Sequence, residues 1–256
     1  MASAERMPPD APEKVSVLET GISATSYSEL VRLIAKWGRA GQQAWVAICN
    51  VHAVMEAHKD PGFARVLNAA AVATPDGMPL VWALRRAGRT GQSRVYGPDL
   101  LAEFAKFAAG EEDLASYFYG GGRGVADELA AELGRRFPGF RVAGAESPPF
   151  RELTPEEDAA AVERINASGA KVLWVGLGCP KQERWMYAHR EVINPVMIGV
   201  GAAFDFHTGR VRQAPRWMMR VGLEWLFRLA VEPGRLWRRY LLNNPHFLWH
   251  LYLAGR

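Results

Sequence analysis

The chain has 256 residues, of which 49% are hydrophobic and 23% are charged, and its formal net charge is +4. These values are ordinary for a globular protein and exclude a largely disordered or collagen-like chain. Arg, Glu or Pro interrupts every long apolar segment, so no run reaches the about 18 apolar residues that a membrane-spanning helix needs.

Residues 1–14 mix Pro, Glu, Asp and Lys without an apolar run, and we expect a disordered tail there. Because this segment lacks the apolar region of a secretory signal peptide, the sequence favours a cytoplasmic protein. Cys49 and Cys179 have neither the number nor the spacing of a disulfide framework or a metal site. We therefore expect two free thiols.

The elements that follow alternate between strands and helices. Residues 15–25 are predicted to form one or two edge strands, and a capping box of Ser26 and Glu29 begins the first helix. A later helix begins at Thr154. Short apolar runs are predicted to be buried parallel strands at residues 45–49, 69–74, 114–119, 141–145, 171–177 and 196–203. This order predicts an α/β fold with a Rossmann-like, mostly parallel sheet and helices on both faces.

Past Arg210 the strand patterns stop, and a helical pattern continues with breaks expected at Pro233 and at Asn244-Pro245. Residues 210–256 contain nine Arg against two Glu, a net charge of +7, so the rest of the chain carries −3. We divide the chain into an α/β catalytic domain (residues 15–209) and a basic helical appendage (residues 210–256). The appendage is expected to complete the active site and to dock on the inner face of the plasma membrane. The side chains expected to insert there are Trp237, Leu241, Phe247, Trp249 and Leu251.

Polar residues follow the predicted strands at the edge where open α/β sheets bind their ligands. Asp76-Gly77 is also a common turn pair, and a lone histidine such as His52 is often a structural group. The segments that could meet in one cleft are 50–52, 74–77, 120–124, 178–183 and 204–206.

The glycine run at residues 120–124 has the spacing G-x-G-x-G, and Val125 stands where the dinucleotide fingerprint has its last glycine. The run is either a tight strand-to-helix turn or a cradle whose backbone N–H groups hold a diphosphate. In the second interpretation, the candidates for nucleotide binding are Gly120, Gly122, Gly124, Gly176 and Gly178.

Together these motifs resemble the WecG/TagA/CpsF glycosyltransferase family, also called glycosyltransferase family 26, over residues 15–249. The most specific segments are 74–77 with 81–82, 175–178 with 180–183, 198–201 with 204–206 and 209–210, and 214–217 with 222–225. The resemblance implies an inverting transfer of a hexose, such as N-acetylmannosamine or glucose. The implied donor is a UDP-sugar and the implied acceptor is a polyprenyl-diphosphate-linked sugar, in the synthesis of bacterial cell-surface polysaccharide.

The resemblance also implies roles for single residues. Asp76 would be the general base, and the amide of Gln182 would position sugar hydroxyl groups. Asn50 would bind substrate, although Ile48-Cys49 precedes it where many members have Thr-Pro. The other implied substrate-binding residues are Thr74, Lys181, Asp205, Arg228, Arg235 and Arg238, with the arginines placed at the donor diphosphate.

The sequence has no Asp-x-Asp pair of the kind that holds a divalent ion at a donor diphosphate, so we expect no metal and no cofactor. A nicotinamide-dependent dehydrogenase or a methyltransferase would share the fold, but the incomplete glycine fingerprint argues against both. A basic membrane-surface or nucleic-acid-binding module would leave the cleft motifs unexplained, so nucleic acid is not an expected partner. The sequence leaves open whether the chain forms a homo-oligomer.

Overall fold

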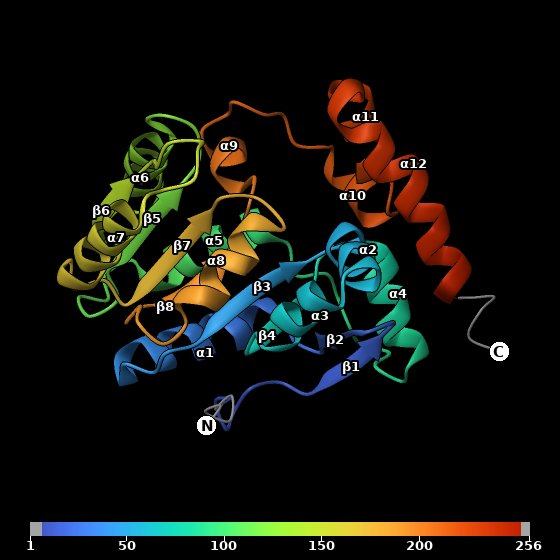
Figure 1. The fold of residues 1–256 in the computed structure, drawn as a ribbon, viewed down its shortest axis with the longest axis horizontal. Helices are drawn as coiled ribbons and strands as arrows, with labels where there is room; N and C mark the ends of the chain where they lie inside the picture. The colour runs from blue at the N-terminus through green and yellow to red at the C-terminus, as the bar shows by residue number, and fades with distance from the viewer. Residues whose placement is uncertain (1–6, 252–256) are drawn as a thin grey trace.

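The computed structural model describes residues 7–251, and its centre is a six-stranded parallel sheet with the order β4-β3-β8-β7-β5-β6 (Figure 1). The strands are β3 (Trp45–Cys49), β4 (Val72–Pro75), β5 (Ser116–Gly120), β6 (Val142–Glu146), β7 (Val172–Gly176) and β8 (Val196–Gly199). The predicted fold class is confirmed, and each core strand overlaps its predicted range.

Helices cover both faces of the sheet because the strands are apolar on both sides. Trp45, Ala47 and Cys49 pack into one core and Val46 and Ile48 into the other. The helices on the first face are α2 (Val51–Lys59), α3 (Pro61–Asn68), α4 (Met78–Arg86), α7 (Pro155–Ala167) and α8 (Lys181–His189). Those on the second are α1 (Tyr27–Ala40), α5 (Gly97–Ala108), α6 (Val125–Arg136) and α9 (Ala203–His207).

The N-terminal strands differ from the expectation that they extend the sheet edge. β1 (Lys14–Val17) and β2 (Thr20–Ser23) pair with each other as a separate antiparallel hairpin. At the edge strand β4, the Ala73 N–H donates to the Ser23 side-chain oxygen over 3.1 Å. The hairpin thus contacts the sheet edge through a side-chain hydroxyl and not through backbone pairing of strands. Of the expected disordered tail, residues 1–6 lie outside the described residues, and Asp10 accepts a hydrogen bond from the Trp37 indole.

The C-terminal helices α10 (Arg216–Arg220), α11 (Glu224–Val231) and α12 (Pro233–Trp249) stand beside α2 and α4 at one side of the sheet (Figure 1). The break at Pro233 is confirmed, but the break at Pro245 is wrong because α12 continues through it. Contacts with α2 hold this stretch: Phe247 is fully buried, and Asn243 accepts a hydrogen bond from Lys59. The expected insertion of Phe247 into a membrane is therefore wrong. No helix within residues 7–251 is both long and apolar enough to cross a bilayer.

Candidate active site

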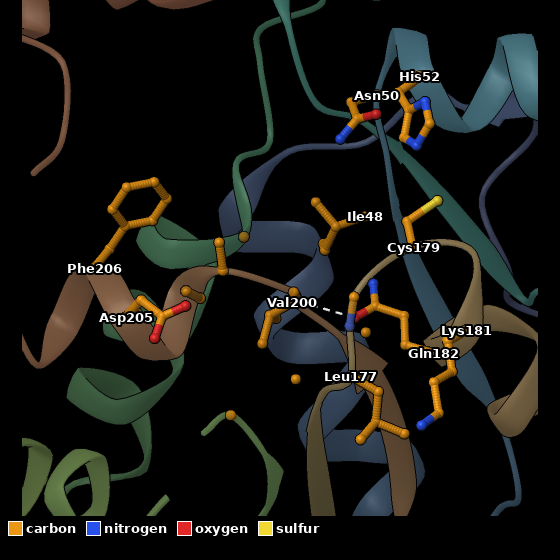
Figure 2. A pocket seen from close by; sticks show the side chains of 18 of the residues that line it. Ile48, Asn50, His52, Leu177, Cys179, Lys181, Gln182, Val200, Asp205 and Phe206 are labelled. Carbon is orange, nitrogen blue, oxygen red and sulfur yellow. Dashed lines mark hydrogen bonds between the residues drawn. The ribbon is translucent and has the colours of Figure 1, made fainter. Parts of the chain in front are cut away.

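A cleft of about 870 Å³ opens at the carboxyl ends of the parallel strands, the edge where α/β sheets bind their ligands (Figure 2). Residues that follow β3, β4, β5, β7 and β8 meet there with side chains from the appendage. Ten of the predicted site residues line this cleft. They are Asn50, Asp76, Gly122, Gly176, Gly178, Lys181, Gln182, Asp205, Arg228 and Arg238.

Two predicted substrate-binding residues are placed differently. Thr74 is fully buried in β4, and its hydroxyl donates a hydrogen bond to the Val95 carbonyl oxygen over 3.3 Å. It therefore holds the segment that leads into α5 instead of lining the cleft. Arg235 belongs to α12, but its side chain lies outside the described part of the structure.

The glycine run at residues 120–124 contains a position that the fold restricts to glycine and positions that border the cleft. A Cβ atom on Gly120 would lie 2.5 Å from the carbonyl carbon of Gly176, its partner across β5 and β7, so this position must be glycine. Gly124 has φ 79° and caps α6. Gly121 and Gly122 both border the cleft, although only Gly122 was predicted to bind nucleotide.

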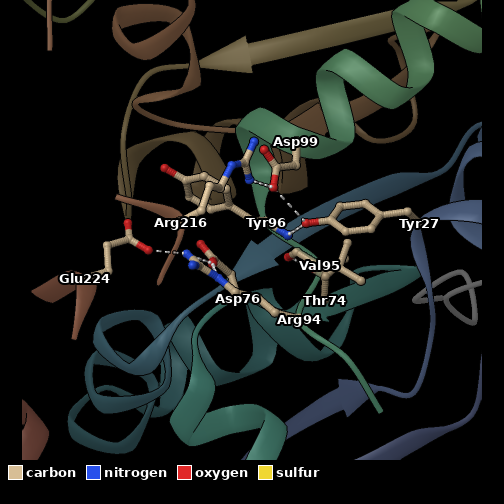
Figure 3. Close-up of polar contacts among 9 residues, drawn as sticks. All are labelled: Tyr27, Thr74, Asp76, Arg94, Val95, Tyr96, Asp99, Arg216 and Glu224. Atoms are coloured by element: carbon tan, nitrogen blue, oxygen red, sulfur yellow. Dashed lines mark hydrogen bonds and ion pairs between the residues drawn. The ribbon is translucent and has the colours of Figure 1, made fainter. Parts of the chain in front are cut away.

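Asp76 takes part in a buried ion-pair chain that crosses from the catalytic domain to the appendage (Figure 3). Nε and Nη2 of Arg94 lie 2.9 and 2.7 Å from Oδ1 of Asp76, and Nη2 also lies 2.6 Å from Oε2 of Glu224 on α11. Oδ2 of Asp76 has no hydrogen-bond partner among residues 7–251. One oxygen of the carboxylate is thus held by a guanidinium while the other remains available to a ligand.

The three side chains of this ion-pair network are largely shielded from solvent. The side chains of Asp76, Arg94 and Glu224 are only 12–15% exposed. Burial raises the pKa of the Glu224 carboxyl, and the charge of Arg94 opposes that shift. The guanidinium of Arg94 also lies 4.2 Å from the centre of the Tyr96 ring.

Sequence reasoning did not identify Arg94, because it lies in the connection between α4 and α5 and not directly after a strand. No spacing rule links residues 76, 94 and 224, which only the folded chain brings together. Glu224 does stand in one of the motifs that carry the family resemblance, but the motif gives no sign of its partner.

Gln182 ties together the two loops that follow β7 and β8. Its Oε1 accepts hydrogen bonds from the backbone N–H groups of Gly178 and Gly201, at 3.3 and 3.0 Å. Its Nε2 donates to Oε1 of the buried Glu183 over 2.8 Å. Because these contacts engage both ends of the amide, Gln182 shapes the wall of the cleft.

Asn50 and His52 line the cleft from the start of α2 (Figure 2). Asn50 is the N-cap of this helix, with Oδ1 accepting a hydrogen bond from the Ala53 N–H over 3.2 Å. The ring nitrogen Nδ1 of His52 lies 3.3 Å from the Asn243 side-chain nitrogen on α12. His52 therefore lines the cleft, as predicted, and also contacts the appendage.

The appendage contributes cations to the mouth of the cleft. Arg228 lies with its guanidinium 5.6 Å from the centre of the Phe206 ring, and its Nη2 is 3.9 Å from Glu232. Its buried Nε has no hydrogen-bond partner among the described residues. Arg238 lines the same cleft from α12. These side chains could meet an anionic group of a bound ligand.

No group of three or more His, Cys, Asp or Glu side chains within residues 7–251 is arranged to hold a metal ion. Neither Cys49 nor Cys179 forms a disulfide bond, as expected; Cys49 is buried and Cys179 borders the cleft. The carboxylate of Asp76, which lines the cleft, is paired with the guanidinium of Arg94.

Two comparisons relate the chain to known proteins. The profile of the glycosyl transferase WecG/TagA/CpsF family matches residues 15–256. The chain is 31% identical over 206 residues to a protein of Bacillus spizizenii (strain ATCC 23059 / NRRL B-14472 / W23), and the match covers 80% of this chain and 77% of that relative. The relative is named N-acetylglucosaminyldiphosphoundecaprenol N-acetyl-beta-D-mannosaminyltransferase.

Proposed function

Because this chain belongs to the WecG/TagA/CpsF glycosyltransferase family, we propose that it transfers a hexose from a UDP-sugar to a polyprenyl-diphosphate-linked sugar, with inversion. The proposed donor sugar is of the N-acetylmannosamine type, glucose or a related hexose, and the product serves cell-surface polysaccharide synthesis. The name of the relative supports N-acetylglucosamine as the first acceptor sugar to test. The observation that carries the proposal is the carboxylate of Asp76, which has one oxygen paired with Arg94 and lines a cleft bordered by arginines.

Asp76 acts as the general base in this proposal. The acceptor oxygen forms a bond to the anomeric carbon as the bond from that carbon to the UDP oxygen breaks. UDP leaves with the electron pair of the broken bond, and the acceptor proton passes to Asp76. Oδ2 suits this task because Arg94 contacts only Oδ1.

The departing diphosphate gains negative charge, and arginines of the appendage meet it in place of a metal ion. Arg228 and Arg238 border the cleft, and Arg235 is assigned the same role by its family position. The loops that hold Gly122, Gly176 and Gly178 are assigned to the nucleotide, although the Gly178 N–H itself donates to Gln182. No cofactor takes part.

The sugar groups are held by polar side chains around the cleft. Asn50, Lys181 and Asp205 border the cleft and are assigned to substrate. Gln182 is assigned to catalysis as a positioning residue, since its contacts with Gly178 and Gly201 set the distance between the loops that follow β7 and β8.

We further propose that the appendage docks on the cytoplasmic face of the membrane, where the lipid-linked acceptor lies. Large apolar side chains of the C-terminal helices are exposed among arginines, with Trp217 62% and Trp249 58% exposed. Each Lys or Arg near an anionic surface contributes about 1 kcal/mol of binding, so several together can hold a protein there. Interfacial Trp side chains add apolar contact.

The transferase activity is tested by product detection. The protein is incubated with a panel of UDP-sugars and short-chain lipid-diphosphate N-acetylglucosamine, and products are identified by mass spectrometry. A product heavier than the acceptor by one hexose or one N-acetylhexosamine unit, according to the donor supplied, supports the proposal. Absence of such a product with every donor would reject it.

Membrane docking is tested separately with point variants, because Glu224 and Phe247 of the appendage are buried against the catalytic domain and a truncation would disturb the fold. The double variant Trp217→Ser with Trp249→Ser should lose binding to anionic vesicles but keep transfer to the soluble acceptor. The matched control replaces Phe107 and Val192, exposed side chains outside the appendage, by Ser. Equal vesicle binding by both double variants would reject this surface.

A further inference from the structure

A second, smaller pocket of about 100 Å³ adjoins the main cleft and lies between the catalytic domain and the appendage. The residues that border both cavities are Asn50, His52, Asp76, Tyr96 and Arg228. The other walls of the small pocket include Arg94 and, from the appendage, Met219, Glu224 and Trp225. Asp76 therefore stands where the two cavities meet.

Tyr96 presents a polar atom that the protein leaves without a partner. The residue is only 4% exposed, yet its hydroxyl makes no hydrogen bond with any described residue. Burial raises the pKa of this hydroxyl, so it remains a neutral donor at physiological pH. Buried polar groups in native proteins nearly always have partners, and a bound ligand would supply one to the buried hydroxyl of this residue, whose side chain borders both cavities.

The geometry of inverting transfer divides the two cavities between the substrates. The acceptor hydroxyl approaches the anomeric carbon from the side opposite the leaving diphosphate, and the base must contact that hydroxyl. Only the main cleft has the volume for a nucleotide sugar, and it holds the glycine loops and Arg238. The acceptor must then reach Asp76 from the other side, which is the small pocket.

The walls of the small pocket have the chemistry of a sugar site. Glu224 and Arg94 offer charged hydrogen-bonding groups, whereas Trp225 and Met219 offer apolar surface for the C–H face of a ring. Part of the pocket belongs to the appendage, which carries the proposed membrane surface. A sugar attached to a membrane lipid would therefore enter from the side where its anchor lies.

We propose that the small pocket binds the terminal sugar of the lipid-linked acceptor and that the Tyr96 hydroxyl hydrogen-bonds to a hydroxyl group of that sugar. This inference rests on the proposed transferase function and adds to it the place of the acceptor. Tyr96 becomes a residue that determines acceptor affinity through its hydroxyl, and the proposal assigns that hydroxyl no contact with the donor.

The test is a calorimetric binding measurement on the full chain with short-chain lipid-diphosphate N-acetylglucosamine, in the presence of UDP. Tyr96→Phe removes only the hydroxyl and should weaken acceptor binding roughly tenfold, the effect of one lost hydrogen bond to a ligand. Its affinity for UDP and its melting temperature should remain those of the wild type, since the hydroxyl has no protein partner. The control is Tyr117→Phe, whose hydroxyl bonds to Glu146 away from both cavities and should leave acceptor affinity unchanged.

Each alternative outcome is distinct. Unchanged acceptor binding by Tyr96→Phe, or a loss of UDP affinity instead, would overturn the assignment of the small pocket. A wild-type protein that fails to bind this acceptor would overturn it as well. A wild-type protein that binds the acceptor as described but transfers no sugar from any UDP donor would instead refute the proposed function.

Discussion

Asp76 and Glu224 share one guanidinium nitrogen, since Nη2 of Arg94 lies 2.7 Å from Oδ1 of the first and 2.6 Å from Oε2 of the second. The contact joins a carboxylate that lines the cleft to a residue of α11 that lies 148 positions later in the chain. The appendage is therefore held against the residue proposed as the general base, and it is also the proposed membrane surface.

Replacing Arg94 by Met should lower the free energy of unfolding by about 3–5 kcal/mol, because it leaves two buried carboxylates without their cation. The deficit should grow as the pH rises above the ordinary pKa of glutamate, because loss of the Arg94 charge, which opposes the effect of burial, raises the pKa of Glu224 further in the folded variant. Urea unfolding at several pH values measures both effects.

Arg39 provides the matched control, because it pairs with Glu111 and Asp113 on the surface. Arg39→Met should change the free energy of unfolding much less than Arg94→Met does, because solvent screens ion pairs on the surface. Equal losses for the two variants would show that the Arg94 pairs contribute no more than surface pairs do.

Replacing Gln182 by Met keeps the length of the side chain but leaves the Gly178 and Gly201 N–H groups without their acceptor. We expect a loss of about 1–3 kcal/mol in the free energy of unfolding and weaker UDP binding, since both loops border the cleft. Gln43→Met, at an exposed site whose amide bonds to Glu191 and Ile193 carbonyl groups, should leave UDP affinity intact. Equal UDP affinity in both variants would contradict the role of Gln182.

His207 should make folding sensitive to mild acid. Burial lowers its pKa below the ordinary value, with its Nε2–H donating to the Pro98 carbonyl oxygen. As the pH falls below about 6.5, the unfolded chain takes up a proton that the folded chain resists, so stability decreases. His207→Gln should remove this part of the slope between about pH 7 and pH 5, as measured by urea unfolding. Parallel curves for the two proteins would contradict the prediction.

Transfer should continue in excess EDTA, because arginines of the appendage are assigned to the diphosphate charge and Asp76 is paired with Arg94. Product formation is measured before and after chelation. Activity that disappears with EDTA and returns with Mg²⁺ or Mn²⁺ would show that a metal ion does this work.

The sequence was informative where one local pattern decides the outcome. Apolar runs between helical patterns located the core strands, and parallel strands necessarily bring residues such as Asn50 and Asp76 to one edge. Arg94 and Tyr96 were not found, since they act through contacts that only the folded chain creates. The helix break predicted at Pro245 was wrong for the same reason. Packing of Phe247 and Asn243 against α2 outweighs the local preference of proline for a break.

The most direct test of the central claim compares the turnover of wild-type protein and Asp76→Asn with the same UDP-sugar and short-chain acceptor. The amide retains an oxygen for Arg94 but cannot accept the acceptor proton. Turnover should fall by about 10²–10⁴-fold while UDP affinity and the melting temperature stay near wild type. A variant that keeps more than about half of the wild-type turnover would contradict the account, because Asp76 would then be a turn residue and not the base.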